Sequence, residues 1–300
     1  RRDPAATPFQ SPEWVLPWFR HFGSGEILGL AARADGGLEA FAPLFILRDE
    51  DDPSESLGML IGTGNTDYLD VLATSREAVD VIVARATEAD CAMWDLQQLR
   101  ESSPLLAAAA PAGYEDLVEP HDACLVLSID GADLGSTHFR KKLRYYRRSL
   151  ERLGSVRVET PTMQTIDRFM DALFDLHAAR WKVRGLPGML AAEVDQSFHR
   201  EVARGMLHSG ALRMYAICLD DRIVAVFYGF AHHETVYFYL SGYDPALEKL
   251  SPGTLVVAHA VEEAVRDGAK TFDFLRGAED YKYAWGAEDR RNRRRRLIRT

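Results

Sequence analysis

The spacing of hydrophobic and polar residues divides the second half of the chain into a clear series of elements. Three apolar runs are joined by the short polar turns Asp220-Asp221 and His232-His233-Glu234. Turns this short require neighbouring antiparallel strands. The predicted strands cover 212–219, 223–230 and 236–240, and a helix over 252–266 and a buried strand over 271–275 follow. Because the helix is a crossover, we expect the last strand to lie parallel to the strand at 236–240.

Three helices are predicted before this meander, near 137–153, 165–181 and 198–208. In the first, apolar residues from Phe139 to Leu153 recur on one face, and Gly154 stands where the helix should stop. Its other faces carry seven cations against one acid, Glu151. In the second, His177 and Arg180 continue the apolar stripe. Polar groups on a buried face need partners, so this helix end is a candidate site.

The first half has a mixed pattern. Strands are predicted over 27–32 and 38–47, joined at Asp35-Gly36-Gly37, and over 57–61, 68–72, 91–96 and 124–129, with helices over 76–89 and 103–110. A polar, glycine-containing link at 130–136 indicates a domain boundary. We therefore predict an α+β fold with a mixed sheet in two lobes, 1–135 and 136–300.

Composition limits the partners. The 300 residues are 47% hydrophobic and carry a formal charge of −9, so a nucleic acid would need a local basic patch. Two such tracts exist, the helix from Arg140 to Arg152 and a tail with seven arginines between Arg290 and Arg299. Either could contact RNA phosphates, but solvated surface or counter-charges for the acidic remainder are favoured.

Cysteine usage and the absence of a long apolar run bear on the compartment. Cys91, Cys124 and Cys218 lie far apart among apolar neighbours and form no zinc or disulfide pattern. We expect three buried thiols and a cytoplasmic protein without a metal. The first ten residues have no signal-peptide core, and no run is long enough to span a bilayer.

The start of the helix at 252–266 suggests chemistry. Ser251 is a suitable N-cap and Pro252 suits the first helical position. Backbone N–H groups and the dipole at a helix start favour a pyrophosphate. Acyl-CoA offers one, and the strand beside the helix can receive its pantetheine arm.

Several stretches carry a resemblance to a known family: TPFQSPEW, FRKKLRYYRRSLERLG, HAARW, YLSGYDPALEKLSPGTL and FDFLRGAEDYKYAW. They resemble the GNAT-type acetyltransferases of the CelD/BcsL-like family, relatives of the FemAB aminoacyltransferases. The resemblance implies two tandem GNAT-like lobes, with the acyl donor bound by the second. The chain departs from the standard phosphate loop, because it has only Gly253 there and Pro252 supplies no amide.

Amide-forming acyl transfer needs a deprotonated amine, a donor for the developing oxyanion and a held thioester. The expected catalytic residues are Asp273, Lys282, which matches the family's YK, and Arg180. For donor binding we expect Lys249, Ser251, Gly253 and Thr254. The expected substrate-binding residues are His177, Trp181, Tyr239, Arg276 and Trp285. Each also has a structural reading, such as an ion pair for Arg180 or a core role for His177 and Tyr239.

Three functions remain open. The first is an acyltransferase that moves an acetyl or acyl group from acyl-CoA to an amine or hydroxyl of a small polar or sugar-type acceptor, within exopolysaccharide biosynthesis as the family name suggests. It acts by direct attack in a ternary complex. The second keeps the fold but uses aminoacyl-tRNA, the one case in which a nucleic acid is expected. The third is a catalytically silent binding or scaffold protein. The sequence leaves the oligomeric state open.

Overall fold

The computed structural model describes residues 3–48, 56–131, 136–183, 185–186 and 188–300. Contacts divide the chain into two compact units, Arg1–Cys124 with Arg290–Thr300, and Leu125–Asp289. The predicted link at 130–136 lies largely outside the described residues. The division falls earlier than the predicted boundary at residue 135, inside a long strand. The last residues, which we had placed in the second lobe, pack in the first unit because they form a strand of its sheet.

The sheet of the first unit has the strand order β1-β2-β3-β5-β12-β6. The strands are β1 (Glu26–Ala34), β2 (Gly37–Arg48), β3 (Ser56–Leu60), β5 (Met93–Arg100), β6 (Tyr114–Ser128) and β12 (Glu288–Arg299), and the short β4 (Leu72–Ala73) pairs with β2. The helices are α1 (Pro12–Phe22), α2 (Arg76–Thr87) and α3 (Pro104–Ala107), preceded by the 3-10 turn η1 (Pro8–Gln10).

Most local predictions for this unit hold, but α3 covers only Pro104–Ala107 of the predicted helix over 103–110, and β6 begins at Tyr114, well before the predicted strand over 124–129. The β1–β2 hairpin turns at Asp35 and Gly36, which both have positive φ, as a two-residue turn of this kind requires. The predicted strand at 68–72 is wrong, since only Leu72–Ala73 is extended. Tyr68 is nevertheless fully buried, so its apolar character reflects burial in a loop.

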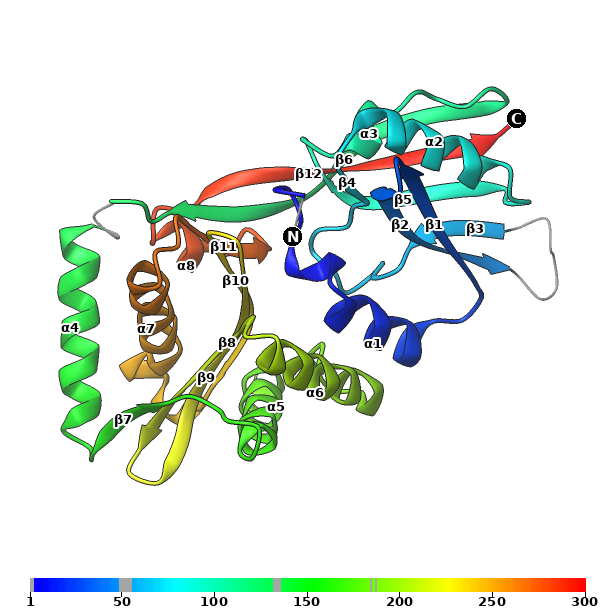
Figure 1. Cartoon of the computed structure of the whole chain (residues 1–300). Helices are drawn as coiled ribbons and strands as arrows, with labels where there is room; N and C mark the ends of the chain where they lie inside the picture. The colour runs from blue at the N-terminus through cyan, green and yellow to red at the C-terminus, as the bar shows by residue number, and fades with distance from the viewer. Residues whose placement is uncertain (1–2, 49–55, 132–135, 184, 187) are drawn as a thin grey trace. The chain divides into compact units, whose positions relative to one another are not determined.

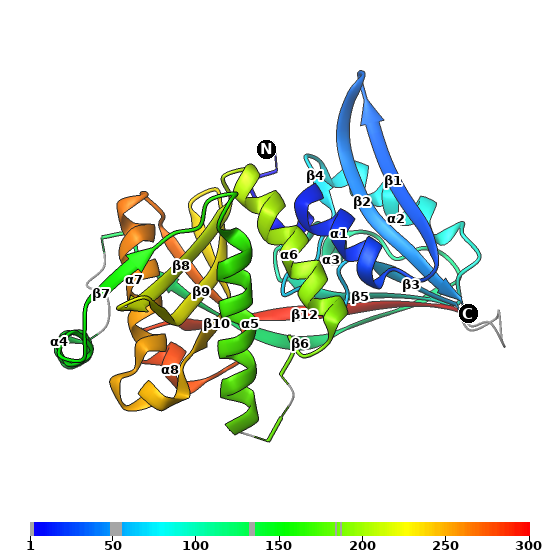
Figure 2. The ribbon, with the colours of Figure 1, turned by 90° about the horizontal axis from the view of Figure 1, so that it is seen from below.

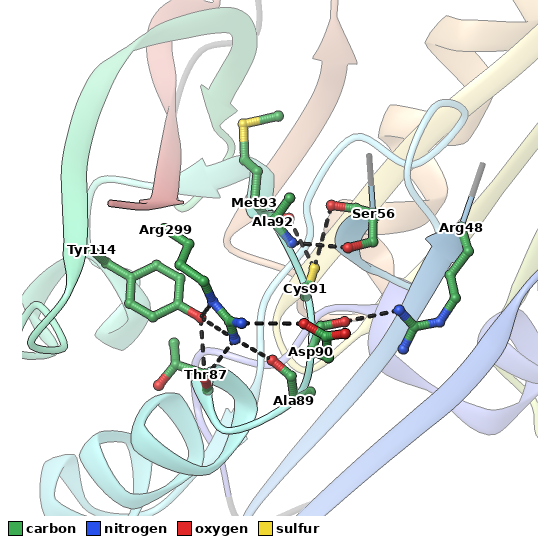
Figure 3. Close-up of polar contacts among 10 residues, drawn as sticks. All are labelled: Arg48, Ser56, Thr87, Ala89, Asp90, Cys91, Ala92, Met93, Tyr114 and Arg299. Atoms are coloured by element: carbon green, nitrogen blue, oxygen red, sulfur yellow. Dashed lines mark hydrogen bonds and ion pairs between the residues drawn. The ribbon is translucent and has the colours of Figure 1, made fainter. Parts of the chain in front are cut away.

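Strand β12 turns the arginine-rich tail into a structural element. It pairs antiparallel with β5, and its guanidinium groups meet acids of the same unit: Arg294 with Asp95 at 2.6 Å, Arg295 with Asp116 at 2.8 Å, Arg296 with Glu119 at 3.0 Å, and Arg299 with Asp90 at 3.2 Å. Figure 3 shows Arg299 between Tyr114 and the end of α2. The tail therefore supplies counter-charges, as favoured from composition.

The second unit is a sheet covered on both faces. The end of β6 is followed by β11 (Thr271–Arg276), β10 (Thr235–Tyr243), β9 (Arg222–His232), β8 (Leu212–Leu219) and β7 (Val156–Glu159). Helices α4 (Thr137–Glu151) and α7 (Pro252–Arg266) lie on one side of β8–β10, and α5 (Ile166–Val183) and α6 (Glu193–His208) on the other (Figures 1 and 2). The 3-10 turn η2 (Pro245–Leu250) precedes α7, and the short α8 (Asp280–Tyr283) follows β11.

The two units repeat one arrangement. Each has three antiparallel strands, followed by a helix and by a strand that lies parallel to the third. In the first unit these elements are β1, β2, β3, α2 and β5, and in the second they are β8, β9, β10, α7 and β11. The predicted parallel pairing of the last strand with β10 is confirmed. In the first unit the chain itself bridges the end of the parallel pair, because the Leu69 amide donates to the Gln98 carbonyl at 3.1 Å and Asn292 donates to the Asp67 carbonyl at 2.9 Å.

The three cysteines are buried free thiols, as expected. In the described ranges, no helix is long and apolar enough to cross a membrane.

Candidate active site in the second unit

Strands β10 and β11 separate soon after they pair. Their parallel register covers only Thr235–Tyr237 against Thr271–Asp273. Beyond it, β10 continues to Tyr243 with a bulge between Phe238 and Leu240. In β11, Leu275 takes a left-handed φ of 58°. A wedge therefore opens between two neighbouring strands, and a bulge of this kind commonly re-aims side chains beside a site.

A cavity of about 220 Å³ lies along the β10 side of this opening. Helices from both faces of the sheet contribute to it. Its lining consists of Arg180 from α5, Phe238, Ser241 and Tyr243 from β10, Glu248 and Ser251 before α7, Gly253, Thr254 and Val257 from α7, and Tyr281 and Trp285 near α8. Of the twelve predicted site residues, the cavity gathers Arg180, Ser251, Gly253, Thr254 and Trp285.

The first turn of α7 is open toward the cavity. Ser251 occupies the predicted N-cap position with left-handed φ and ψ of 48° and 50°, but its side chain makes no capping hydrogen bond. Pro252 has no N–H. Among the described residues, the amides of Gly253 and Thr254 find no acceptor. Two free N–H groups and the positive end of the helix dipole thus meet at one wall.

Gly253 is required by a close approach. A Cβ at this position would lie 2.8 Å from Cδ1 of the Tyr243 ring. The ring therefore rests against the α7 backbone, and any larger residue would push it toward the cavity. This contact explains why a glycine stands at this position.

Arg180 reaches the cavity from the end of α5. Its Cζ lies 5.3 Å from the centroid of the Tyr243 ring. Its Nε is buried without a hydrogen-bond partner, and no described acid pairs with the guanidinium. An unpaired, partly buried guanidinium is costly unless a ligand or water satisfies it. The ion-pair reading of Arg180 therefore has no support in the described residues.

Asp273 and Lys282 do not line the cavity and instead hold the bend of β11. The buried Asp273 accepts a hydrogen bond from the Leu275 amide at 2.9 Å. Lys282, only 3% exposed, donates to the carbonyls of Arg276 at 2.6 Å and Gly277 at 3.1 Å, and pairs with Glu279 at 2.8 Å. Both side chains stabilise the backbone that turns away from β10.

The remaining predicted residues do not line the cavity. His177 is buried and accepts a hydrogen bond from Trp181 Nε1 at 2.8 Å. Burial, with a smaller effect of Arg180, lowers the pKa of His177 from 6.5 to about 4, which keeps it neutral. Tyr239 packs against His199, Tyr228 and Phe230. Lys249 is exposed, and Arg276 offers its carbonyl to Lys282.

Sequence reasoning did not select Ser241, Glu248 or Tyr281 as site residues. The period-two rule groups Tyr239 with Ser241 and Tyr243, but the bulge breaks that alternation, so Phe238 shares the cavity with Ser241 and Tyr243 instead. Glu248 precedes α7 in η2 and accepts from the Tyr243 hydroxyl at 3.4 Å. Its position just before the phosphate-type loop was the signal available.

A meander, a crossover helix with an open N-terminus, and a splayed parallel strand define the GNAT-type acyltransferase fold. Residues 137–283 match the family model described as an acetyltransferase (GNAT) domain. The comparison with curated proteins gives no match.

Solved structures support the fold over the whole chain. FemX is 11% identical, with 98% of this chain and 92% of that chain covered at a TM-score of 0.72. The C-terminal domain of a putative lysylphosphatidylglycerol synthetase from Agrobacterium fabrum is 11% identical, with coverages of 95% and 87% and a TM-score of 0.60. L-PGS from Bacillus licheniformis is 11% identical, with coverages of 97% and 92% and a TM-score of 0.59. At such identities the likeness concerns the fold alone.

Proposed function

We propose that this protein is an acyltransferase that moves an acetyl or acyl group from acyl-CoA to an amine or hydroxyl of a small polar acceptor. The observation that carries the proposal is the cavity at the β10–β11 opening. It has the uncapped start of α7 on one side and the unpaired Arg180 on the other. Donor and acceptor can thus approach one point from opposite faces of the sheet, as direct transfer in a ternary complex requires.

The donor's phosphates fit the α7 end of the cavity. The free amides of Gly253 and Thr254 are donors for an anion at a helix N-terminus. The pantetheine arm then runs along β10 beside Phe238 and Ser241 and brings the thioester into the opening. Ser251 lines this end of the cavity, whereas Lys249 is exposed and does not line it.

In the reaction, the acceptor nitrogen or oxygen attacks the thioester carbonyl. The new C–N or C–O bond forms, the C–S bond breaks, and the acceptor's proton is passed on while the CoA thiolate is protonated. Glu248, the carboxylate of the cavity lining, is our assignment for the group that receives the acceptor proton, directly or through water. Arg180 holds an anionic group of a substrate by charge-assisted hydrogen bonds. An amino sugar or a polysaccharide precursor suits such a site.

Asp273 and Lys282 serve in this proposal as positioning residues. Their hydrogen bonds fix the bend at Leu275 and thereby the width of the opening. Substitution of either residue should change the shape of the cavity and thereby lower activity. Because the same hydrogen bonds stabilise the fold, the free energy of unfolding should fall together with the activity.

The test is calorimetric titration of the protein with acetyl-CoA at low and moderate salt, with bulk tRNA as a parallel ligand. Wild type binds acetyl-CoA, and Gly253→Val abolishes binding because its side chain displaces the Tyr243 ring into the cavity. Gly29→Ala is the matched control, since its Cβ meets only Phe41 at 3.9 Å. Thiol release from acetyl-CoA in the presence of amino sugars then measures transfer.

A second candidate is transfer of an aminoacyl group from tRNA. The exposed cations of α4, which have few acidic partners among the described residues, favour it. Two of the similar folds are called lysylphosphatidylglycerol synthetase or L-PGS, and the first of these names states a lysyl transfer. Salt-sensitive tRNA binding with no response to acetyl-CoA would replace the acyl-CoA proposal by this one. Binding of neither acetyl-CoA nor tRNA would favour a catalytically silent binding or scaffold protein.

A further inference from the structure

Helix α4 brings a lysine and a tyrosine to the start of α7. Lys142 Nζ lies 5.6 Å from the centroid of the Tyr146 ring. Tyr146 packs against the core of the second unit together with Leu247 and Leu250, the residues just before Ser251. Burial acts to raise the pKa of Tyr146, but interactions with Ser251 and Lys142 outweigh it and lower the pKa. Tyr146 therefore lies beside Ser251 at the start of α7, and the Lys142 ammonium group lies next to the Tyr146 ring.

Lys142 is exposed, and no described acid pairs with it. Its contact on the protein is the ring of Tyr146, so its charge is not neutralised. On the same helix Arg147 does have an acidic partner, Glu262 at 3.5 Å. Most arginines of β12 also have acidic partners, among them Arg295 and Arg296, so the charges of α4 stand out in a chain of net charge −9.

The loop at the start of α7 offers few backbone N–H groups to a phosphate. Pro252 removes one amide from the first turn of α7, and two remain for an anion. The donor of the proposed reaction carries a pyrophosphate and, on its ribose, a further 3′-phosphate. A cation beside the loop would neutralise charge that the loop amides leave uncompensated.

We propose that Lys142 and Tyr146 form a second phosphate subsite beside the start of α7, which binds the 3′-phosphate of the acyl-CoA nucleotide. The subsite rests on the proposed function and adds an element, α4, that precedes the meander in sequence. Lys142 supplies the charge and the Tyr146 hydroxyl supplies a hydrogen bond. The exposed cations farther along α4 contribute only a general attraction, which salt screens.

The experiment compares CoA with 3′-dephospho-CoA in wild type, Lys142→Gln, Tyr146→Phe and Arg152→Gln, by calorimetry at moderate salt. Wild type binds CoA more tightly than dephospho-CoA. Lys142→Gln weakens CoA about five- to tenfold and leaves dephospho-CoA within about twofold, as expected for the loss of one charge-assisted contact. Tyr146→Phe acts in the same direction but less. Arg152, exposed at the other end of α4, is the charge-matched control and changes both ligands alike.

Three results overturn the inference. Equal affinity of wild type for the two nucleotides, or equal losses for both in Lys142→Gln, would refute the subsite while leaving the donor class intact. No binding of either nucleotide by wild type would refute the proposed function together with the subsite. If wild type binds tRNA in place of CoA, and Lys142→Gln weakens that binding, the phosphate bound by Lys142 belongs to RNA. Circular dichroism of each variant confirms that it folds.

Discussion

Polar side chains in the buried parts of the second unit separate into two kinds. Asp273 and Lys282 make hydrogen bonds to backbone groups, and Lys282 also pairs with Glu279, whereas Arg180 has a buried Nε without a partner. A residue whose hydrogen bonds are complete within the protein holds the backbone in place. A residue left with an open donor at a cavity is the better choice for binding substrate. This distinction depends on three-dimensional contacts, so the residue type alone does not reveal it.

His177 gives a prediction at the same scale. Its pKa is lowered from 6.5 to about 4, first by burial and then by Arg180. The unfolded chain therefore binds a proton at a higher pH than the folded protein does. The stabilising contribution is complete above pH 6.5 and is lost as the pH falls toward 4, a change of about 3 kcal/mol in the free energy of unfolding. His177→Gln should remove this part of the pH dependence.

Urea denaturation at pH 7 and pH 4.5 measures the effect. Burial also lowers the pKa of His199, to about 3, so His199 likewise makes the free energy of unfolding fall as the pH falls. His177→Gln should therefore reduce the pH dependence of the free energy of unfolding without abolishing it. His208→Gln, an exposed change on α6, should leave the profile unchanged. An identical profile for His177→Gln and wild type would show that His177 does not carry the effect.

At the scale of elements, prediction succeeded where local signals are complete. The meander and α7 follow from turns, apolar spacing, Pro252 and Gly268, all of which lie within a few residues of each element. Helix α1 escaped prediction because Pro17 lies inside it. Strand β12 escaped because its seven arginines read as a solvated tail, and the acids that pair with them are about 170 to 210 residues away in sequence.

The candidate site shows the same limit. The start of α7 could be predicted, since a helix N-terminus is a local feature. Tyr239 was misplaced because a one-residue bulge reverses which side chains face the cavity. The tasks of Asp273 and Lys282 depend on a bend at Leu275, and the sequence FDFLRG gives no sign of its left-handed φ.

Arg295 tests the structural role of β12. Its side chain is 1% exposed, is held by both oxygens of Asp116 and donates to the carbonyls of Leu105 and Ala108. Arg295→Met leaves a carboxylate and two carbonyls without their donor, so the first unit should lose about 2–4 kcal/mol in free energy of unfolding.

Urea denaturation followed by tryptophan fluorescence measures this loss. The control is Arg291→Met on the same strand, where the side chain is exposed, and it should change stability by less than about 0.5 kcal/mol. Equal effects of the two substitutions would mean that β12 is held by its backbone pairing alone.

At the scale of the whole molecule, the same arrangement of strands and helix occurs in both units, but the end of its parallel strand pair differs between them. The parallel pairs β3–β5 and β10–β11 each span three residues, and Asp95 and Asp273 stand at matching positions. In the first unit, Leu69 and Asn292 bridge the end of the pair, and Arg294 neutralises Asp95. In the second, the corresponding end is open. This difference supports our proposal that the reaction takes place in the second unit.

Removal of residues 290–300 should affect the two units unequally. The deletion takes away Asn292, Arg294 and Arg295, so amides of β5 and β6 should lose protection against hydrogen exchange, whereas β8–β10 keep theirs. Hydrogen exchange read by mass spectrometry measures both. The double variant Arg290→Ala/Arg291→Ala, which alters exposed side chains only, is the control. Equal loss of protection in both units would contradict this division of the chain.

The place of β12 also sets an order of events during translation. The ribosome makes the chain from residue 1 onward, yet the first unit takes a strand from Arg290–Thr300. Until those residues leave the exit tunnel, β5 has an unpaired edge, and the acids Asp95, Asp116 and Glu119 lack their arginines. The second unit, Leu125–Asp289, is contiguous and can fold as it emerges. The unit whose first part is made earlier is therefore completed later, and it remains open to chaperones and to wrong strand partners until Arg290–Thr300 emerges.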